Sequence, residues 1–137
     1  MQELRMMLVD DEERFLSTTK RLLSKKGYEV VTATSGAEAL DKLRDEEIHV
    51  VILDVKMPGM SGIATLEEIR RRFPLVEVIM LTGHATMESA VDGLRSGATD
   101  YLMKPTDIDE IIQKAEEAFL KRQRHEERIR MAETRKS

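Results

Sequence analysis

Three carboxylates in this sequence stand directly after apolar runs, where they could share a metal ion. Asp10 and Asp11 follow residues 6–9, and Asp54 follows residues 50–53. The carboxyl ends of parallel strands meet at one edge of a sheet, so a strand order of 2-1-3-4-5 would bring the three acids together. Carboxylates about 4 Å apart repel each other by roughly 4 kcal/mol at an effective dielectric of 20, so such a cluster must bind protons or a cation. Oxygen ligands without nearby His or Cys favour Mg²⁺, although a single strand-end Asp is more often a cap.

A hydroxyl and a cation occupy two further strand ends. Thr82 closes the run 78–81, and Lys104 follows the run 101–103 and precedes Pro105. Lys104 could form an ordinary salt bridge. A metal, a cation and a hydroxyl around one carboxylate are also what phosphoryl transfer requires, because its transition state spreads charge over three oxygens. A carboxylate can act as the nucleophile and form an aspartyl phosphate.

Five apolar runs alternate with five helical patterns along the chain. The runs are continuous, which is typical of parallel strands that are covered on both faces. Strict alternation predicts an α/β protein with right-handed crossovers. The runs are residues 6–9, 30–33, 50–53, 78–81 and 101–103. Apolar positions at helical spacing lie between and after them, including Met87, Ala90, Val91 and Leu94 in the fourth pattern.

Capping signals delimit three of the predicted helices. Gly27 is placed to end the first helix, and Ser35 with Glu38 has the spacing of a capping box at the start of the second. The fifth pattern opens at Asp107 and fades after Phe119. We expect its helix to run to about residue 130.

Composition restricts the class of protein. The 137 residues fit one domain, and the absence of cysteine excludes disulfides and thiol chemistry. Residues 120–137 carry seven basic against three acidic side chains, +4, which leaves about −8 on residues 1–119. An acidic body argues against nucleic acid as a direct ligand. With no leader pattern or long apolar segment, the expected location is the cytoplasm, away from membranes.

Five motifs together, in order and spacing, resemble the response-regulator receiver family over residues 3–120. The resemblance implies a flavodoxin-like fold, a doubly wound five-stranded parallel sheet of order 2-1-3-4-5 with five helices. It places a receiver domain at residues 1–120 and a charged helical extension or linker at residues 121–137. The motifs are Asp10-Asp11, Leu53-Asp54-Val55-Lys56-Met57-Pro58, Gly59-Met60-Ser61-Gly62, Leu81-Thr82-Gly83-His84-Ala85 and Lys104-Pro105.

The resemblance also implies a role for each matching position. Asp54 would be the phosphoacceptor, Asp11 a direct Mg²⁺ ligand and Asp10 a ligand largely through water, with Mn²⁺ as a substitute metal. The backbone carbonyl of Lys56 would supply a further oxygen. Thr82 would hydrogen-bond the phosphoryl group, and Lys104 would pair with it.

For three side chains, the role implied by the resemblance has a simpler structural alternative. Tyr101 matches the aromatic switch position, yet a Tyr that merely packs on its strand is an equal alternative. The side chains of Lys56 and His84 stand where receivers tune the lifetime of the phosphoaspartate. Both could equally be exposed loop residues.

The segment from residue 81 to residue 101 is most similar to NtrC-like receivers. The implied partners are a sensor histidine kinase or phosphotransfer protein and a downstream effector, with a homodimer as a further candidate. Such a chain is a switch that catalyses only its own phosphorylation and dephosphorylation, rather than an enzyme. No Gly-x-x-x-x-Gly-Lys-[Ser/Thr] loop is present, so the chain is either a stand-alone receiver or a piece of a longer regulator.

Other classes explain the sequence less well. A haloacid-dehalogenase-like phosphatase would need a second Asp two residues after Asp54, where Lys56 stands. A flavodoxin-like cofactor binder would need a Ser/Thr/Gly-rich loop after the first strand, where the sequence has Asp10-Asp11-Glu12-Glu13. A degenerate receiver that acts only as a phosphorylation-independent interaction module would not need the complete set of site residues.

Overall fold

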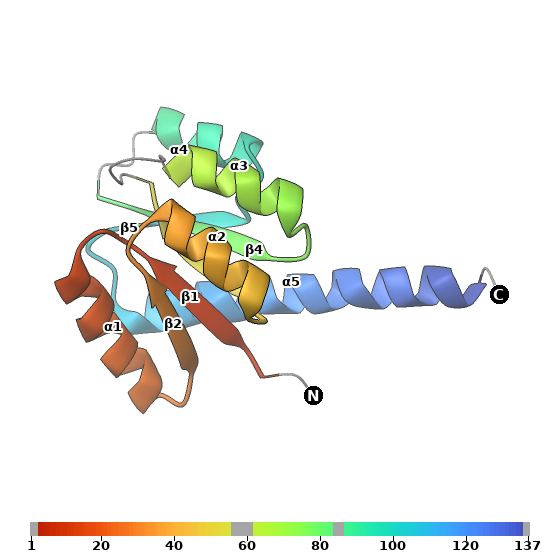
Figure 1. Ribbon diagram of the computed structural model, residues 1–137, viewed down its shortest axis with the longest axis horizontal. Coiled ribbons are helices and arrows are strands. Elements are labelled where there is room, and N and C mark those ends of the chain that lie inside the picture. Colours follow the sequence, from red (N-terminus) through yellow and green to blue (C-terminus); the bar gives the residue numbers. More distant parts are fainter. Residues whose placement is uncertain (1–2, 56–61, 84–86, 136–137) are drawn as a thin grey trace.

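The computed structural model describes residues 3–55, 62–83 and 87–135 and consists of alternating strands and helices (Figure 1). The continuous apolar runs form strands, as predicted, each within one residue of the expected bounds. The order is β1 (Arg5–Val9), α1 (Glu13–Lys25), β2 (Glu29–Ala33), α2 (Gly36–Asp45), β3 (Val50–Asp54), α3 (Gly62–Arg72), β4 (Glu77–Thr82), α4 (Met87–Arg95), β5 (Asp100–Met103) and α5 (Ile108–Arg135).

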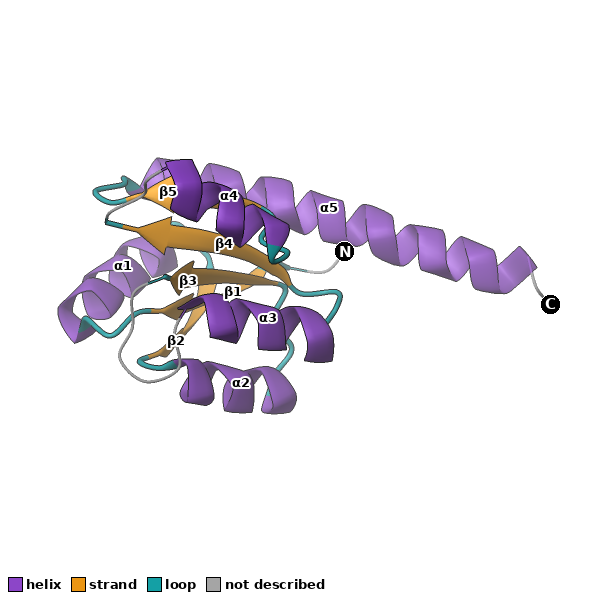
Figure 2. Ribbon diagram, turned by 90° about the horizontal axis from the view of Figure 1, so that it is seen from above, coloured by secondary structure: helices purple, strands orange, loops and turns teal. Residues whose placement is uncertain are grey.

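The five strands form one parallel sheet of order β2-β1-β3-β4-β5 (Figure 2). This confirms the predicted doubly wound, flavodoxin-like topology. Met6 of β1 pairs with Val30 on one side and with Val50 on the other. Strand order therefore reverses direction between β1 and β3, and open α/β sheets generally bind ligands beyond the carboxyl ends of the strands at such a point.

Helices cover both faces of the sheet and bury separate hydrophobic clusters. One cluster joins α2 and α3 to side chains such as Met7, Val51 and Met80. The other joins α1 and α5 to alternate side chains of the same strands, such as Met6 and Ile52. Because successive residues of a strand point to opposite faces, continuous apolar runs supply both clusters.

Two helix boundaries show the expected capping contacts. Gly27 has a φ of 92°, and the Tyr28 N–H donates to the Leu23 carbonyl at 3.2 Å, so α1 ends in a Schellman motif. At the start of α2 the Glu38 N–H donates to Ser35 Oγ at 3.1 Å. In a capping box the Glu side chain would accept from the N–H of the N-cap residue Ser35. Here the Glu38 carboxylate instead accepts from the hydroxyl of the preceding residue, Thr34, at 3.0 Å.

Two side chains of the apolar pattern predicted for the fourth helix, Val91 and Leu94, lie at the surface rather than in the core. These side chains are 39% and 43% exposed. Gly93 is the residue that approaches the sheet, since a Cβ added there would lie 1.9 Å from the Met80 methyl carbon. A close approach through a glycine turns the flanking apolar residues of α4 toward the surface.

The fifth helix continues well beyond the sheet (Figure 1). It extends to Arg135, five residues past the expected end near residue 130. Its buried side chains end at Phe119, and ion pairs such as Arg122–Glu126 at 2.6 Å support the part that follows. No helix in the described ranges is long and apolar enough to cross a membrane.

His49 links the amino-terminal edge of the sheet to the base of this projecting helix. Its ring is buried, its Nδ1 accepts from the Arg5 N–H at 3.0 Å, and its Nε2 lies 3.1 Å from the Glu47 carboxylate. The ring centroid is 4.9 Å from that of Phe119 in α5. Burial lowers the pKa of His49 below 6.5, with Arg122 adding to the effect and Glu47 and Glu126 opposing it. The neutral ring, with its proton on Nε2, fits both contacts.

We expect protonation of His49 to destabilise the fold. The unfolded chain takes up this proton near pH 6.5, and the folded chain only at a lower pH. The contribution of the neutral His49 ring to the free energy of unfolding is therefore complete above pH 6.5 and is lost as the pH falls. From about pH 7.5 to about pH 5.5, the free energy of unfolding should fall more steeply for the wild type than for His49→Asn. Urea denaturation measures this, with the exposed His125→Asn as the matched control; equal slopes for the wild type and His49→Asn would contradict it.

Candidate metal centre at the ends of β1 and β3

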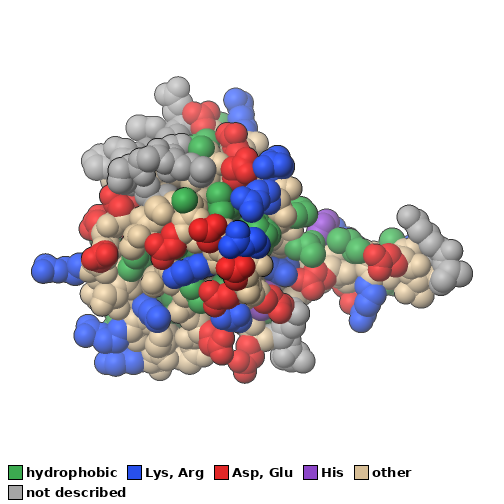
Figure 3. Space-filling view, viewed as in Figure 1, with side chains coloured by type: hydrophobic (Ala, Val, Ile, Leu, Met, Phe, Trp, Pro, Cys, Tyr) green, Lys and Arg blue, Asp and Glu red, His purple; other side chains and the backbone are tan. Residues whose placement is uncertain are grey.

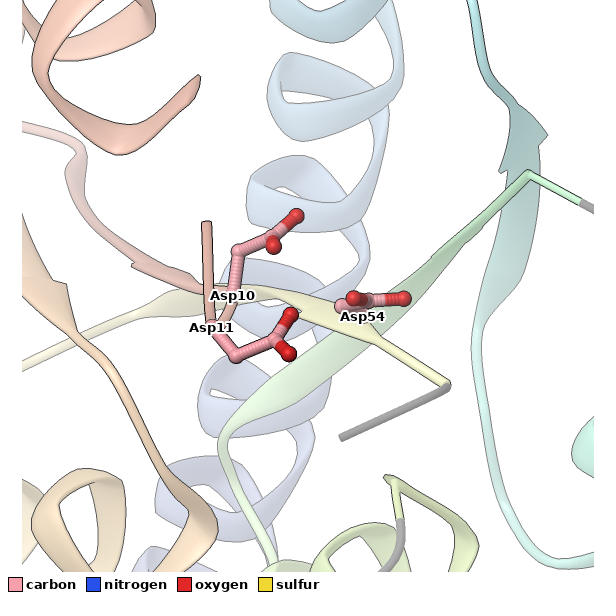
Figure 4. Close-up of side chains that lie close together, drawn as sticks. All are labelled: Asp10, Asp11 and Asp54. Atoms are coloured by element: carbon pink, nitrogen blue, oxygen red, sulfur yellow. The ribbon is translucent and has the colours of Figure 1, made fainter. Parts of the chain in front are cut away.

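The three carboxylates predicted from the strand ends do come together (Figure 4). Oxygen atoms of Asp10, Asp11 and Asp54 all lie within 4.8 Å of one another. Asp10 and Asp54 are 1% and 6% exposed, whereas Asp11 is exposed. The parallel pairing of β1 with β3 ends both strands at the same edge, which is why residues far apart in the sequence meet here. The cluster therefore combines two buried carboxylates with one that faces solvent.

Lys104 supplies a positive charge to this cluster. Its ammonium group donates to Asp10 Oδ2 at 2.6 Å, lies 3.8 Å from Glu12 Oε1 and stands 4.4 Å from the centroid of the Phe15 ring. Burial alone would lower the pKa of Lys104, but the hydrogen bond to Asp10 and the attraction of Asp10, Asp54 and Glu12 outweigh it and raise the pKa above 10.5. Lys104 therefore stays protonated at neutral pH.

Thr82 lies at the neighbouring strand end and is tied to Lys104 through the backbone. Its side chain is buried, and its carbonyl accepts from the Lys104 N–H at 2.8 Å. The Lys104–Pro105 peptide bond is cis. The Tyr101 side chain is 37% exposed on β5. Lys56 and His84, predicted as a metal ligand and as lifetime-tuning residues, lie outside the described residues.

The donor set suits a hard divalent cation. Asp10, Asp11 and Asp54 offer only carboxylate oxygens, and Asp11 keeps one side open to solvent, as expected for Mg²⁺, which retains several waters. Asp10 is already held in place, since its second oxygen accepts from the Glu12 N–H at 2.9 Å. The residues present therefore fit a magnesium site.

Comparison with protein families identifies this arrangement. Residues 6–116 match the response regulator receiver domain. The chain belongs to this family. Receivers are typically signalling switches in two-component systems rather than enzymes, and their partners are histidine kinases. An acidic metal site is typical of the family.

Curated relatives include NtrC-like regulators, which confirms the resemblance drawn from residues 81–101. The chain is 39% identical over 113 residues to the transcriptional regulatory protein ZraR of Escherichia coli K12, covering 82% of this chain and 26% of ZraR. It is 38% identical over 112 residues to the DNA-binding transcriptional regulator NtrC of the same organism, covering 82% and 24%. This receiver thus spans about a quarter of the length of these relatives.

Solved receiver structures superpose closely. The receiver domain of NtrX from Brucella abortus aligns with a TM-score of 0.78 and 35% identity, covering 83% of this chain and 97% of that one. A CheY-like receiver from Methanospirillum hungatei JF-1 aligns with a TM-score of 0.84 and 33% identity, covering 90% and 99%. Both support the fold of this receiver.

Sequence reasoning missed three residues that shape the receiver's acidic cluster. Phe15 packs beneath Lys104, and Glu12 flanks it. Phe15 is the first residue of the apolar stripe of α1, so its place in the helix could be predicted from the sequence. Its contact with the Lys104 ammonium group could not. Gly62, at the start of α3, donates its N–H to the Val55 carbonyl at 3.1 Å. This contact holds the first turn of α3 against the end of β3.

Gly62→Ala is expected to destabilise the protein by about 2 kcal/mol or more, because its Cβ would overlap backbone that cannot rotate away. The added carbon would lie 2.4 Å from Val55 Cα and 2.6 Å from the Asp54 carbonyl oxygen. Chemical denaturation measures the loss. Gly83→Ala is the control, since its Cβ would meet nothing within 4 Å and should change stability by less than about 0.5 kcal/mol. Similar losses in the two variants would show that steric overlap at Gly62 is not the cause.

Proposed function

We propose that this receiver accepts a phosphoryl group on Asp54 from the phosphohistidine of a sensor histidine kinase or phosphotransfer protein, with Mg²⁺ as cofactor. One observation carries the proposal: a buried Asp54 lies within 4.8 Å of two further carboxylates, beside the strand ends that bear Thr82 and Lys104. In the transfer the donor's P–N bond breaks as a P–O bond forms to an Asp54 oxygen. Asp54 attacks as the carboxylate, whose negative charge attracts the Lys104 ammonium group.

Asp11, Asp10 and the Lys56 carbonyl are proposed to hold the metal together with Asp54. Bound there, Mg²⁺ would neutralise the carboxylates and the phosphoryl oxygens, as in other phosphoryl-transfer sites. Asp10 contributes from a fixed orientation, because the Glu12 N–H and Lys104 already bind its two oxygens. Asp11 is exposed and can reorient toward solvent and ligand.

Lys104 and Thr82 are proposed to bind the phosphoryl group on Asp54. The phosphoryl group offers Lys104 a stronger anionic partner than Asp10, and the Thr82 hydroxyl can donate to it. Since the Lys104 N–H bonds to the Thr82 carbonyl, a shift of either residue moves the other. Movement at Thr82 would let Tyr101 turn inward and would bias α4 and β5 between two packings.

The output surface is proposed to be α4, β5 and α5. Exposed apolar side chains gather on the first two of these elements: Val91, Leu94, Tyr101 and Met103. Exposed apolar side chains close together suit a docking partner or a second copy of the receiver better than solvent. We place the receiver unit at residues 1–120 and treat residues 121–137 as an extension of its last helix.

A phosphatase of the haloacid-dehalogenase type is disfavoured because Lys56 stands where its second Asp is required. The protein would instead catalyse only its own phosphorylation and slow dephosphorylation. Lys56 and His84 are proposed to tune that slow step, as side chains placed to hold or exclude the attacking water.

Mass spectrometry after incubation with acetyl phosphate and Mg²⁺ tests this function. One phosphoryl adduct per chain is expected, and EDTA should prevent it. Asp11→Ala should require at least about tenfold more Mg²⁺ for half-maximal labelling, because a metal ligand is lost while the nucleophile stays. Labelling that is indifferent to EDTA, or steady phosphate release from a generic monoester, would refute the proposal.

A further inference from the structure

A basic groove lies where α5 leaves the body of the receiver. It has a volume of about 290 Å³ and runs between α5 and the corner formed by α3 and β4. Its wall carries four permanent cations, namely Arg70 of α3 and Lys121, Arg124 and Arg128 of α5. The projecting part of α5 stands clear of the body of the receiver (Figure 3).

The helix presents its three cations on one face. Lys121, Arg124 and Arg128 are spaced by three and four residues, which places them on neighbouring turns of one face. At a rise of about 1.5 Å per residue they cover about 10 Å along the groove. All three side chains are exposed. The groove therefore offers a row of positive charge rather than a single point.

In the part of the chain that the structure describes, these four cations have no acidic partner, in contrast to several basic residues of the same helices. Arg71 of α3 binds Glu68 at 2.8 Å, and Arg122 of α5 binds Glu126 at 2.6 Å. Across residues 3–55, 62–83 and 87–135, no carboxylate lies within 4.0 Å of the charged nitrogens of the four cations that line the groove. Their charge is thus available to an external anion.

The Arg70 side chain is held in a fixed orientation in the wall of the groove. Arg70 donates to the Val76 carbonyl, and Gly97 packs against its stem, since a Cβ there would lie 2.8 Å from Arg70 Cγ. Glu77 is the acidic residue of the lining, but it is buried and already accepts from the Thr99 hydroxyl. An incoming anion therefore meets an oriented guanidinium rather than a mobile chain end.

The chemistry of the groove favours carboxylates on a short polypeptide. Guanidinium groups bind carboxylates through two parallel hydrogen bonds. None of the described residues lining the groove is Phe, Tyr or Trp, so the groove lacks the large aromatic side chains typical of sites that stack successive nucleobases. The charge of about −8 on residues 1–119 would repel a long polyanion, whereas a short acidic segment need touch only the groove.

We propose that the basic groove binds a short Asp/Glu-rich segment of a partner protein. Glu77 begins β4, whereas the Asp10–Asp11–Asp54 cluster lies beyond the carboxyl ends of the strands, so the two sites occupy opposite edges of the sheet. A partner could dock in the groove whether or not Asp54 is phosphorylated. The groove would then serve as a constitutive tether, at the opposite edge of the sheet from the phosphorylated side chain.

Fluorescence anisotropy with a fluorescein-labelled octaglutamate peptide tests this. We expect saturable binding that weakens as salt rises from about 20 mM to about 200 mM. Arg124→Ala/Arg128→Ala should lower the affinity at least about tenfold, because two charge-assisted contacts are lost. Both side chains are exposed, so circular dichroism should show an intact fold. The control Lys20→Ala/Arg21→Ala removes the same charge from α1 and should change affinity by less than about twofold.

Three outcomes would overturn the proposal. Equal losses in the two double variants would show only general attraction to positive charge. Tighter binding of a duplex oligonucleotide than of octaglutamate, lost in Arg124→Ala/Arg128→Ala, would assign the groove to nucleic acid. Self-association that depends on these two arginines, seen by light scattering without peptide, would assign it to a second copy of the chain.

Discussion

Asp54→Asn is expected to abolish the phosphoryl adduct formed with acetyl phosphate and Mg²⁺, to below about one hundredth of the wild-type level. An amide oxygen is far less nucleophilic than a carboxylate, so the substituted side chain cannot attack the phosphorus atom. The same substitution should stabilise the protein by about 1 kcal/mol or more in EDTA, since it removes one of three carboxylates that lie within 4.8 Å of one another.

These two readouts separate lost chemistry from misfolding. A variant that unfolds at a higher temperature yet accepts no phosphoryl group has lost the acceptor and not the fold. Asp45→Asn removes an exposed carboxylate from α2 and should keep full labelling. Undiminished labelling of Asp54→Asn would refute Asp54 as the phosphoacceptor.

Lys104→Met is expected to lower the free energy of unfolding by about 3 kcal/mol at neutral pH in EDTA. Asp10 is 1% exposed and binds the Lys104 ammonium at 2.6 Å, so the substitution leaves a buried charge without its cation. Mg²⁺ should recover part of the loss. Chemical denaturation with and without the metal measures both effects.

Lys114→Met provides the matched comparison. Lys114 binds Asp100 at 2.7 Å, but both side chains are one-third exposed. Water and ions screen such a pair, so its loss should cost less than about 1 kcal/mol. Equal losses at Lys104 and Lys114 would show that burial of Asp10 does not set the energetics of the site.

The strand ends were predictable because their chemistry and their position coincide in the sequence. Asp10, Asp54 and Lys104 directly follow continuous apolar runs, and parallel topology brings the ends of such runs to one edge. The residue types then indicate a metal and a phosphoryl group. No tertiary information was needed beyond the order of the strands.

What the sequence did not reveal depends on contacts between elements. Helical periodicity identified Val91 and Leu94 as apolar, but it could not show that α4 approaches Met80 through Gly93 and leaves them exposed. Gly62 is adjacent to Val55 only in space, so its role as a steric constraint had no local signal. The pairing of Lys104 with Asp10 likewise depends on two residues that are 94 positions apart.

The fifth helix runs from Ile108 to Arg135 as one element, and this has a mechanical consequence. In an uninterrupted helix, the position of each residue around the helix axis depends on all the residues before it. The direction in which side chains at the C-terminal end of α5 point is therefore fixed relative to the sheet. Each residue inserted after Phe119 would turn everything beyond it by about 100° and advance it by about 1.5 Å. Insertion of seven residues would nearly restore the original angle, whereas insertion of two would point the tip almost the opposite way.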